Sequence, residues 1–360
     1  MQRGASLHPI CVGAVERVAF WMISTDQVSQ YTDHYFLNAR DACAHAQHNP
    51  RLLYQVFQRN DALLCGMKYV LRPFRDAPSN VQVLGLQDGD RIAPLEPVMH
   101  ISGPAQELFA LETVYLGLLA RMTKVATNVR AAVDAAGGKP VLFFAGRFDV
   151  PEVQEYDGYA AKIGGAAGAA TGAQAEGFGG EPVGTMPHAL IAAFEGDTVR
   201  AALALAEARP QEEIWALADF ENDNARTAVE VFRAFRERGL KLTGVRLDTS
   251  AELVDESVRR AGAESKGVNP LLVREVRRAL NEAGGSAVKI CASGGFHADR
   301  IREFEAVKAP VDVYAVGERF FQGSFPFTSD VVAYYRDGQL VPCAKVGRGL
   351  RESPRLERLR

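Results

Sequence analysis

Short apolar segments alternate with segments of helical periodicity from about residue 140 to residue 316. The predicted strands are Val141–Ala145, Ile214–Phe220, Gly244–Leu247, Val288–Ala292 and Val311–Val316. The predicted helices between and after them include Thr198–Ala208, Ala225–Arg238, Asn269–Ala283 and Ala298–Val307. Because these strands are apolar throughout, they predict a parallel sheet that helices cover on both faces. An irregular (β/α) barrel or an open doubly wound sheet would fit this pattern, and we favour the barrel.

The first part of the chain has a mixed pattern. Short strands such as Val81–Leu84 and Pro97–Ile101, separated by turn signals, predict an N-terminal α+β module over residues 26–110. A long helical stretch follows from Glu107 to Ala136 and ends at Gly137-Gly138.

These patterns divide the chain into parts. We expect the α/β barrel domain, with the candidate site, over residues 111–325, and a C-terminal segment over residues 326–360 that returns to the N-terminal module and completes it. Within that segment, the Arg- and Glu-rich residues 351–360 predict a solvated tail. Residues 1–25 predict a disordered extension, and Met22 is an alternative start. The Gly/Ala-rich stretch Gly164–Gly180 reads as a flexible loop, or as a lid over a polyphosphate.

Composition narrows the function classes. An apolar fraction of 47%, a charged fraction of 24% and a net charge of −3 describe an ordinary globular protein with no basic face for nucleic acid. No apolar run reaches the roughly 18 residues of a membrane span, and Glu16 and Arg17 interrupt the apolar N-terminal stretch. The five cysteines are scattered and form no C-x-x-C pair, so we expect a reducing compartment, the cytoplasm.

Polar residues follow the predicted strands at their carboxyl ends, where parallel α/β folds form their sites. They are Arg147, Asp219, Arg246, Asp248, Ser293, Gly294, Gly295, Gly317 and Glu318. Glycines after the last two strands would let backbone N–H groups approach an anion, so a phosphate site is predicted there. Tight turns between strand and helix would explain the same glycines.

The acidic residues leave several functions open. Asp219 and Asp248 could bind ribose hydroxyls, hold a hydrated Mg²⁺ or stabilise a developing positive charge. Helix N-capping is the structural alternative for both, and a neighbouring carboxylate is the structural partner expected for Arg246.

Two further segments carry candidate residues. His188 ends the turn Gly184-Thr185-Met186-Pro187-His188 ahead of a helical segment, and a lone histidine there is structural or catalytic according to its neighbours. Tyr35, in Asp33-His34-Tyr35-Phe36, could stack on a flat heterocycle or pack in the core.

Taken in order, these residues resemble the nicotinate phosphoribosyltransferase family of type II phosphoribosyltransferases. The match runs from about residue 31 to residue 348, and Gly184-Thr185-Met186-Pro187-His188 is its most specific motif. The matching motifs also include Asp33-His34-Tyr35-Phe36, Gly164-Gly165-Ala166-Ala167-Gly168, Arg246-Leu247-Asp248, Ser293-Gly294-Gly295 and Lys345-Val346-Gly347-Arg348.

The resemblance implies a reaction of nicotinate with phosphoribosyl pyrophosphate that gives nicotinate mononucleotide and pyrophosphate. It implies catalytic roles for His188, Asp219 and Asp248, and substrate binding by Asp33, Tyr35, Arg147, Thr185 and Arg246. Ser293, Gly294, Gly295, Gly317 and Glu318 would bind the 5′-phosphate. ATP could drive the reaction through a phosphorylated His188, and Mg²⁺ would arrive on the pyrophosphate without a protein metal site. A homodimer with an interfacial active site is implied, in which Tyr35 reaches the neighbouring subunit's base.

The chain departs from the family in three places. After Arg246-Leu247-Asp248 the family often has Ser-Gly-Asp, whereas this chain has Thr249-Ser250-Ala251-Glu252, and Thr171 is only the nearest candidate for the Ser or Thr that follows the Gly-rich segment. The third departure lies in an arginine-containing motif. Where the family shows Phe-Gly-x-Arg-Arg-x-His-Pro, this chain has Arg147 followed by Phe148, and Val150 in place of the histidine. Alternative functions are therefore phosphoribosyl transfer to another base, such as quinolinate, and a non-catalytic dimer that binds nucleotides.

Overall fold

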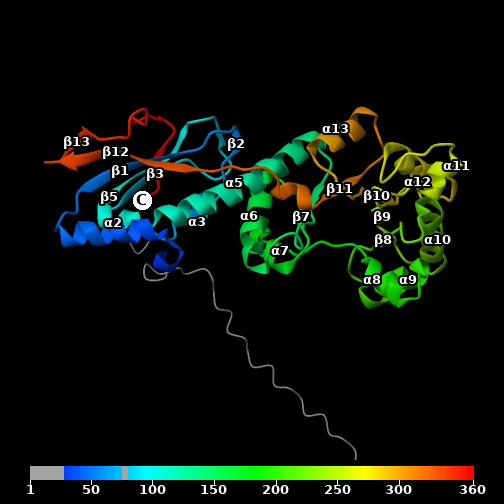
Figure 1. Cartoon of the computed structure of the whole chain (residues 1–360). Coiled ribbons are helices and arrows are strands. Elements are labelled where there is room, and N and C mark those ends of the chain that lie inside the picture. The colour runs from blue at the N-terminus through cyan, green and yellow to red at the C-terminus, as the bar shows by residue number, and fades with distance from the viewer. Residues whose placement is uncertain (1–27, 75–79) are drawn as a thin grey trace, which may run out of the picture.

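The computed structural model describes residues 28–74 and 80–360, which form two α/β units joined by one long helix, α5 (Glu112–Ala135) (Figure 1). The expected extension over residues 1–25 lies outside the described part of the chain. Among the described residues, no helix combines the length and the apolar character that a membrane span needs.

The N-terminal unit is built on an antiparallel six-stranded sheet in the order β13-β12-β1-β5-β3-β14. Its strands are β1 (Arg51–Phe57), β3 (Gln82–Gly85), β5 (Pro97–Pro104), β12 (Thr328–Arg336), β13 (Gln339–Pro342) and β14 (Glu357–Arg358). A small pair, β2 (Ala62–Leu63) and β4 (Arg91–Ile92), lies beside this sheet, and the short helices of the unit are η1 (Ser29–Tyr31), α2 (His34–His45), α3 (Met67–Val70) and α4 (Ala105–Phe109). C-terminal strands thus complete the N-terminal sheet, and β12 lies directly beside β1 (Figure 1).

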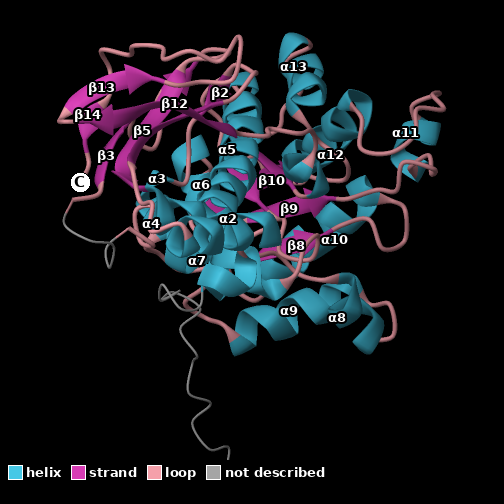
Figure 2. Ribbon diagram, turned by 60° about the vertical axis from the view of Figure 1, so that its left-hand side comes forward, coloured by secondary structure: helices cyan, strands magenta, loops and turns pink. Residues whose placement is uncertain are grey.

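The second unit contains a curled parallel sheet of six strands in the order β7-β6-β11-β10-β9-β8. Its strands are β6 (Val141–Phe143), β7 (Gly168–Ala169), β8 (Trp215–Leu217), β9 (Gly244–Leu247), β10 (Lys289–Ala292) and β11 (Val313–Val316). Its helical segments are η2 (Pro151–Val153), α6 (Gln154–Gly164), α7 (Gly172–Phe178), α8 (His188–Ala193), α9 (Thr198–Ala208), α10 (Asn224–Glu237), α11 (Glu256–Arg260), α12 (Pro270–Glu282), α13 (Ala298–Ala306) and η3 (Glu318–Phe321). Figure 2 shows the helices packed around these strands. The expected fold class, an irregular barrel with a completed N-terminal module, is confirmed.

An extended segment before α8 bridges the two edges of the parallel sheet. The backbone N–H of Val183 donates to the carbonyl of Ala169 in β7 (2.8 Å), and that of Met186 donates to the carbonyl of Trp215 in β8 (3.1 Å). The side chain of Met186 is fully buried in the barrel core. This segment therefore makes the barrel irregular, and it fixes the residues around Thr185 at the rim.

Helix α5 stabilises both units because it contributes to both hydrophobic cores. Its residues Tyr115 and Leu119 pack in the N-terminal core, whereas Val125 and Val129 pack in the barrel core. The helix ends where predicted, at Gly137 and Gly138, which have φ of +59° and +95°, a conformation that glycine adopts without steric cost.

Two sequence-based expectations are wrong. The stretch Gly164–Gly180, expected as a flexible loop or lid, forms the end of α6, strand β7 and helix α7, which starts after an N-cap bond from Gln174 N–H to the Thr171 hydroxyl. The tail 351–360 is not free in solvent, since β14 pairs with β3 and Leu359 packs against the N-terminal core. The small residues between 164 and 180 therefore permit close helix packing, and the charged residues of the tail form part of an edge strand.

Candidate active site

A cavity of about 720 Å³ lies at the carboxyl ends of the parallel strands. The loops after β6, β9, β10 and β11 line it, together with the extended segment before α8. The predicted site residues that line the cavity are Arg147, Thr185, Arg246, Asp248, Ser293, Gly294, Gly295, Gly317 and Glu318. Residues as far apart in the sequence as Arg147 and Glu318, 171 positions, therefore meet at one rim.

A chain of hydrogen bonds connects four of these residues across the cavity floor. Arg246 donates from Nη1 to the Thr185 hydroxyl (2.7 Å) and from Nη2 to Asp248 Oδ2 (2.6 Å). Ser293 donates from its hydroxyl to Asp248 Oδ1 (2.7 Å). Arg246 thus pairs with a neighbouring carboxylate, as its structural alternative predicted. Hydrogen bonds from Arg246 and Ser293 hold both oxygens of Asp248 in place.

His188 and Asp219 form a second polar pair near this rim. The Nε2 atom of His188 lies 3.0 and 3.2 Å from the two Asp219 carboxylate oxygens. The histidine side chain is 47% exposed, whereas that of Asp219 is only 8% exposed. Burial raises the pKa of Asp219, the charge of His188 opposes that shift, and the charge of Asp248 adds to it. Asp219 and Asp248 are therefore close enough to influence each other's charge.

Helix capping does not explain either acid. The N-cap residues that accept bonds from α10 and α11 are Asp223 and Asp255, at 2.8–3.3 Å from the backbone N–H groups of Arg226 and Ser257. Asp219 and Asp248 sit before those caps, at the ends of β8 and β9. The carboxylate of Asp219 contacts His188 instead, and that of Asp248 contacts Arg246 and Ser293.

The loop after β10, residues 293–295 (the anion loop below), is the predicted phosphate site. Gly294 and Gly295 have φ of +84° and +73°, so consecutive residues adopt the left-handed region that favours glycine. Glycines, which have no side chain, also let the backbone N–H groups approach a bound anion closely. Gly317, in contrast, has a φ of −124°, and a side chain there would collide with the Phe148 ring and the Phe144 carbonyl. Gly317 is thus required for close packing, whereas the loop at residues 294–295 needs glycine for its conformation.

Asp33 and Tyr35 do not line the cavity of the same chain. Asp33 precedes α2 and accepts a hydrogen bond from the Thr113 hydroxyl at 2.9 Å. Tyr35 is 62% exposed, so core packing does not explain it. Helix α2 belongs to the N-terminal unit, at the opposite end of the molecule from β8 and β9 (Figure 1).

Sequence reasoning missed several lining residues. Phe144, Phe296 and Arg319 face the cavity, and so does Thr171, which the motif comparison had left uncertain in register. Arg319 lies two residues after Gly317, so its position after a strand end could have identified it from the sequence. The aromatic rings had no such signal, because their apolar character matched that of the core.

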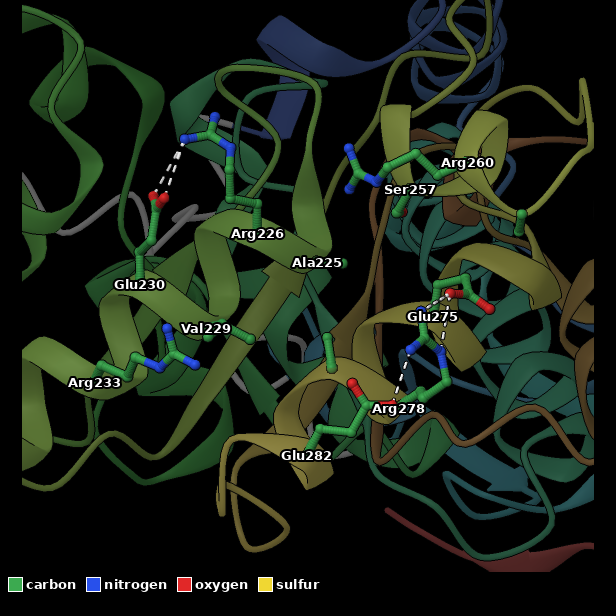
Figure 3. Close-up of a pocket in the computed structure, with 12 residues that line it drawn as sticks. Ala225, Arg226, Val229, Glu230, Arg233, Ser257, Arg260, Glu275, Arg278 and Glu282 are labelled. Atoms are coloured by element: carbon green, nitrogen blue, oxygen red, sulfur yellow. Dashed lines mark hydrogen bonds and ion pairs between the residues drawn. The ribbon is translucent and has the colours of Figure 1, made fainter.

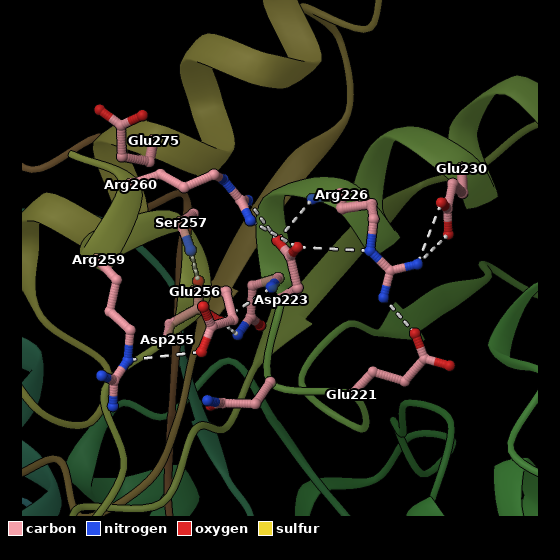
Figure 4. A network of polar contacts seen from close by, with 12 residues as sticks. Glu221, Asp223, Arg226, Glu230, Asp255, Glu256, Ser257, Arg259, Arg260 and Glu275 are labelled. Carbon is pink, nitrogen blue, oxygen red and sulfur yellow. Dashed lines mark hydrogen bonds and ion pairs between the residues drawn. The ribbon is translucent and has the colours of Figure 1, made fainter.

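A second cavity of about 480 Å³ lies between helices α10, α11 and α12 (Figure 3). Its arginines are largely paired with nearby acids: Arg260 binds both oxygens of Asp223, and Arg278 contacts Glu275 and Glu282 (Figures 3 and 4). Arg226 joins the same network through Asp223, Glu221 and Glu230 (Figure 4). This groove lies between helices, away from the strand ends, so the rim cavity is the better candidate site.

Within residues 28–74 and 80–360, no group of three or more His, Cys, Asp or Glu side chains could hold a metal ion. Asp248 lies beside the loop at residues 293–295, where it accepts a hydrogen bond from Ser293.

Comparisons with known proteins agree with the motifs. Residues 33–123 match the family model of the quinolinate phosphoribosyl transferase N-terminal domain. A crystal structure of nicotinate-nucleotide pyrophosphorylase from Pyrococcus furiosus is similar with a TM-score of 0.77 and 30% identity, over 90% of this chain and 79% of that one. A nicotinate phosphoribosyltransferase of Mycobacterium tuberculosis is 28% identical over 75% of this chain and 56% of its own length. One from Bacillus subtilis is 24% identical over 72% of this chain and 51% of its own length.

The chain spans about half the length of these two curated relatives. Its fold, its ordered motifs and the Pyrococcus furiosus similarity agree with one another, and the resemblance drawn from the sequence is confirmed. The chain belongs to the type II phosphoribosyltransferases, the family that contains nicotinate-nucleotide pyrophosphorylase and nicotinate phosphoribosyltransferase.

Proposed function

We propose that this protein transfers a phosphoribosyl group from phosphoribosyl pyrophosphate to nicotinate, in the biosynthesis of NAD. In this reaction the pyridine nitrogen bonds to C1 of the ribose, and the C1–oxygen bond to pyrophosphate breaks. The observation that carries the proposal is the contact between an acid and an anion loop: Ser293, the first residue of that loop, donates to Asp248 at 2.7 Å. A sugar phosphate held there would have its ring beside carboxylates and its phosphate on backbone N–H groups.

The acids have a specific task in this chemistry. Loss of pyrophosphate builds positive charge on the ribose, and a fixed carboxylate stabilises that charge more than it stabilises the neutral sugar. Asp248 suits this role because Arg246 and Ser293 hold both of its oxygens. Asp219 supports it from the neighbouring strand, and Thr185 positions Arg246.

Two other groups would bind the ends of the substrates. Arg147 lines the cavity and would bind the nicotinate carboxylate, for which a guanidinium is the natural partner. The loop Ser293–Gly295 would bind the 5′-phosphate, next to Gly317 and Glu318.

ATP coupling would use His188. Its exposed imidazole is accessible to a phosphate donor, and the Asp219 carboxylate, 3.0 Å from Nε2, orients it. Mg²⁺ would enter with pyrophosphate, since this ion prefers one or two carboxylates together with substrate phosphates, and Asp219 and Asp248 are the carboxylates that would face it. Bound there, it would neutralise the leaving group's charge.

Assembly and location form part of the same proposal. A homodimer would bring Asp33 and Tyr35 of each chain to the partner's cavity, which neither residue reaches within its own chain. The cysteines Cys43, Cys65, Cys291 and Cys343 are free thiols, which suits the reducing cytoplasm.

The test is direct. The purified chain is incubated with Mg²⁺ and phosphoribosyl pyrophosphate, with nicotinate, nicotinamide or quinolinate in turn, and pyrophosphate release is measured with and without ATP. Release with nicotinate supports the proposal. Release with quinolinate alone would assign the chain to the other base, and saturable nucleotide binding without turnover on any base would make it a binding protein.

A further inference from the structure

Phe148 lies in a loop that is anchored on both sides. Gln154 donates from Nε2 to the Gly146 carbonyl at 2.9 Å, and Arg121 forms an ion pair with Asp149 at 2.8 Å. Arg121 itself is fixed by two bonds to the buried Asp157, at 2.8 and 3.0 Å. The backbone around Phe148 is therefore held in place before any ligand binds.

The ring of Phe148 forms part of the cavity wall. It packs so closely on Gly317 that a Cβ atom at that glycine would lie 2.5 Å from Phe148 Cε2. The side chain is nevertheless 38% exposed, because its remaining surface faces the cavity. The fold thus uses a glycine at the end of β11 to seat an aromatic ring at the binding site.

The arginines that line the cavity differ in whether they already have hydrogen-bond partners. Arg246 is bound to Asp248 and Thr185, and Arg319 is bound to the Gln322 side chain at 3.2 Å. Among the described residues, no hydrogen-bond acceptor or acid is bonded to Arg147, whose guanidinium lies 5.2 Å from the centre of the Phe148 ring. Arg147 therefore has a guanidinium free for a ligand carboxylate, and the surface beside it is an aromatic face.

We propose that Phe148 limits the base to a pyridine with a single carboxylate, and this proposal rests on the proposed phosphoribosyl transfer. The first carboxylate pairs with Arg147. A second carboxylate that faces Phe148 and Gly317 would lose water against two residues that offer no cation, and the negative face of an aromatic ring repels anions. Sites that leave a charged or polar group unpaired discriminate strongly between close analogues.

The experiment compares nicotinate with quinolinate, a pyridine dicarboxylate, in the full-length protein. For the unmodified chain we expect kcat/KM to be at least roughly 100-fold higher with nicotinate. Phe148→Arg should lower this ratio at least about tenfold, because it supplies the missing cation. Phe148→Leu should keep the ratio high, because it keeps the wall uncharged. Val150→Arg is the matched control, since it adds the same charge two residues away on a side chain that does not line the cavity.

Binding provides a readout that does not need turnover. Calorimetric titration of both bases into the pyrophosphate-loaded protein gives the ratio of their dissociation constants for each variant. A preference for nicotinate that Phe148→Arg erases supports the inference, and if turnover is absent the same result overturns only the proposed reaction. Equal affinity for both bases in the unmodified chain, or an unchanged ratio in a folded Phe148→Arg variant, overturns the role of Phe148.

Discussion

At the scale of single residues, Asp248 is held by Arg246 on one oxygen and by Ser293 on the other. An amide in its place preserves the shape of the side chain and removes its charge. We therefore expect Asp248→Asn to lower kcat by roughly 10²–10³-fold, because the lost interaction acts on charge that develops only in the transition state. Rapid-quench kinetics and the dissociation constant for phosphoribosyl pyrophosphate separate the two effects. Parallel losses in kcat and in affinity would instead assign Asp248 to ground-state binding.

His188 allows a second prediction at this scale. His188→Ala should abolish stimulation by ATP while leaving ATP-independent transfer measurable. It should also move the acid limb of the pH–rate profile to higher pH, because the imidazolium lowers the pKa of Asp219 and its removal lets that pKa rise further. The carboxylate is then lost at a higher pH as the solution is acidified.

His297→Ala is the control for this variant, since His297 is similarly exposed and lies outside the rim cavity. It should retain stimulation by ATP and an unshifted acid limb. Undiminished stimulation in His188→Ala would remove the histidine from the ATP-coupled step.

At the scale of secondary structure elements, α6 and α7 pack with their backbones almost in contact. A Cβ atom at Gly158 in α6 would lie 2.0 Å from the Gln174 carbonyl oxygen in α7, and one at Gly177 would lie 2.4 Å from the Tyr159 nitrogen. These contacts are with backbone atoms, so a small side chain can be accommodated only if the helices separate. The pair fixes Thr171, which lines the cavity at the start of α7.

Gly158→Ala should therefore destabilise the protein by about 1–3 kcal/mol through overpacking. Gly172→Ala is the matched control, because nothing lies within 4 Å of its Cβ position and the residue begins the same helix. It should be neutral or stabilising by up to about 1 kcal/mol. Thermal and urea unfolding of both variants measure the difference. Equal stability of the two would show that the helices can move apart at no cost.

The same two helices explain where sequence reasoning succeeded and where it did not. Two elements were predicted to the residue, Thr198–Ala208 and Gly244–Leu247, and the predicted helices that became α10, α12 and α13 differ from the observed bounds by one residue at one or both ends. Glycine and alanine between residues 164 and 180 carry no periodic pattern, so α7 and β7 were read as a loop although their small side chains permit the close packing. β14 was missed because its two residues are exposed, and backbone bonds to β3 hold it in the sheet.

The site was predictable to the extent that it follows strand ends. Asp248, Ser293 and Gly294 come directly after strands, and the topology of a parallel sheet brings them together. The partners of each residue were not predictable, since the bond from Arg246 to Thr185 joins residues 61 positions apart. Neither was the position of Phe148, because the contact of its ring with Gly317 exists only in the folded chain.

At the scale of the whole molecule, α2 is incompletely covered. None of the 12 residues of this helix is buried, and the aromatic rings of Tyr31 and Tyr35 are 51% and 62% exposed. Exposed aromatic residues of this kind are typical of protein interfaces. In a twofold dimer each copy of α2 would meet an equivalent site on its partner, so both cavities would be completed at once.

Mixed dimers test this arrangement. Tyr35→Ala and Asp248→Asn should each inactivate homodimers, whereas a purified dimer with one chain of each kind contains one intact site, formed by the cavity of the Tyr35→Ala chain and α2 of the Asp248→Asn chain. We expect about half of the wild-type turnover per dimer. Combining Asp248→Asn with Arg147→Ala provides the control, because both changes lie in the cavity and each site of the mixed dimer keeps one of them. Two tags allow isolation of the mixed species, and pyrophosphate release measures its activity. If the first combination recovers no more activity than the control, or if the chain sediments as a monomer under assay conditions, Tyr35 does not act across a subunit interface.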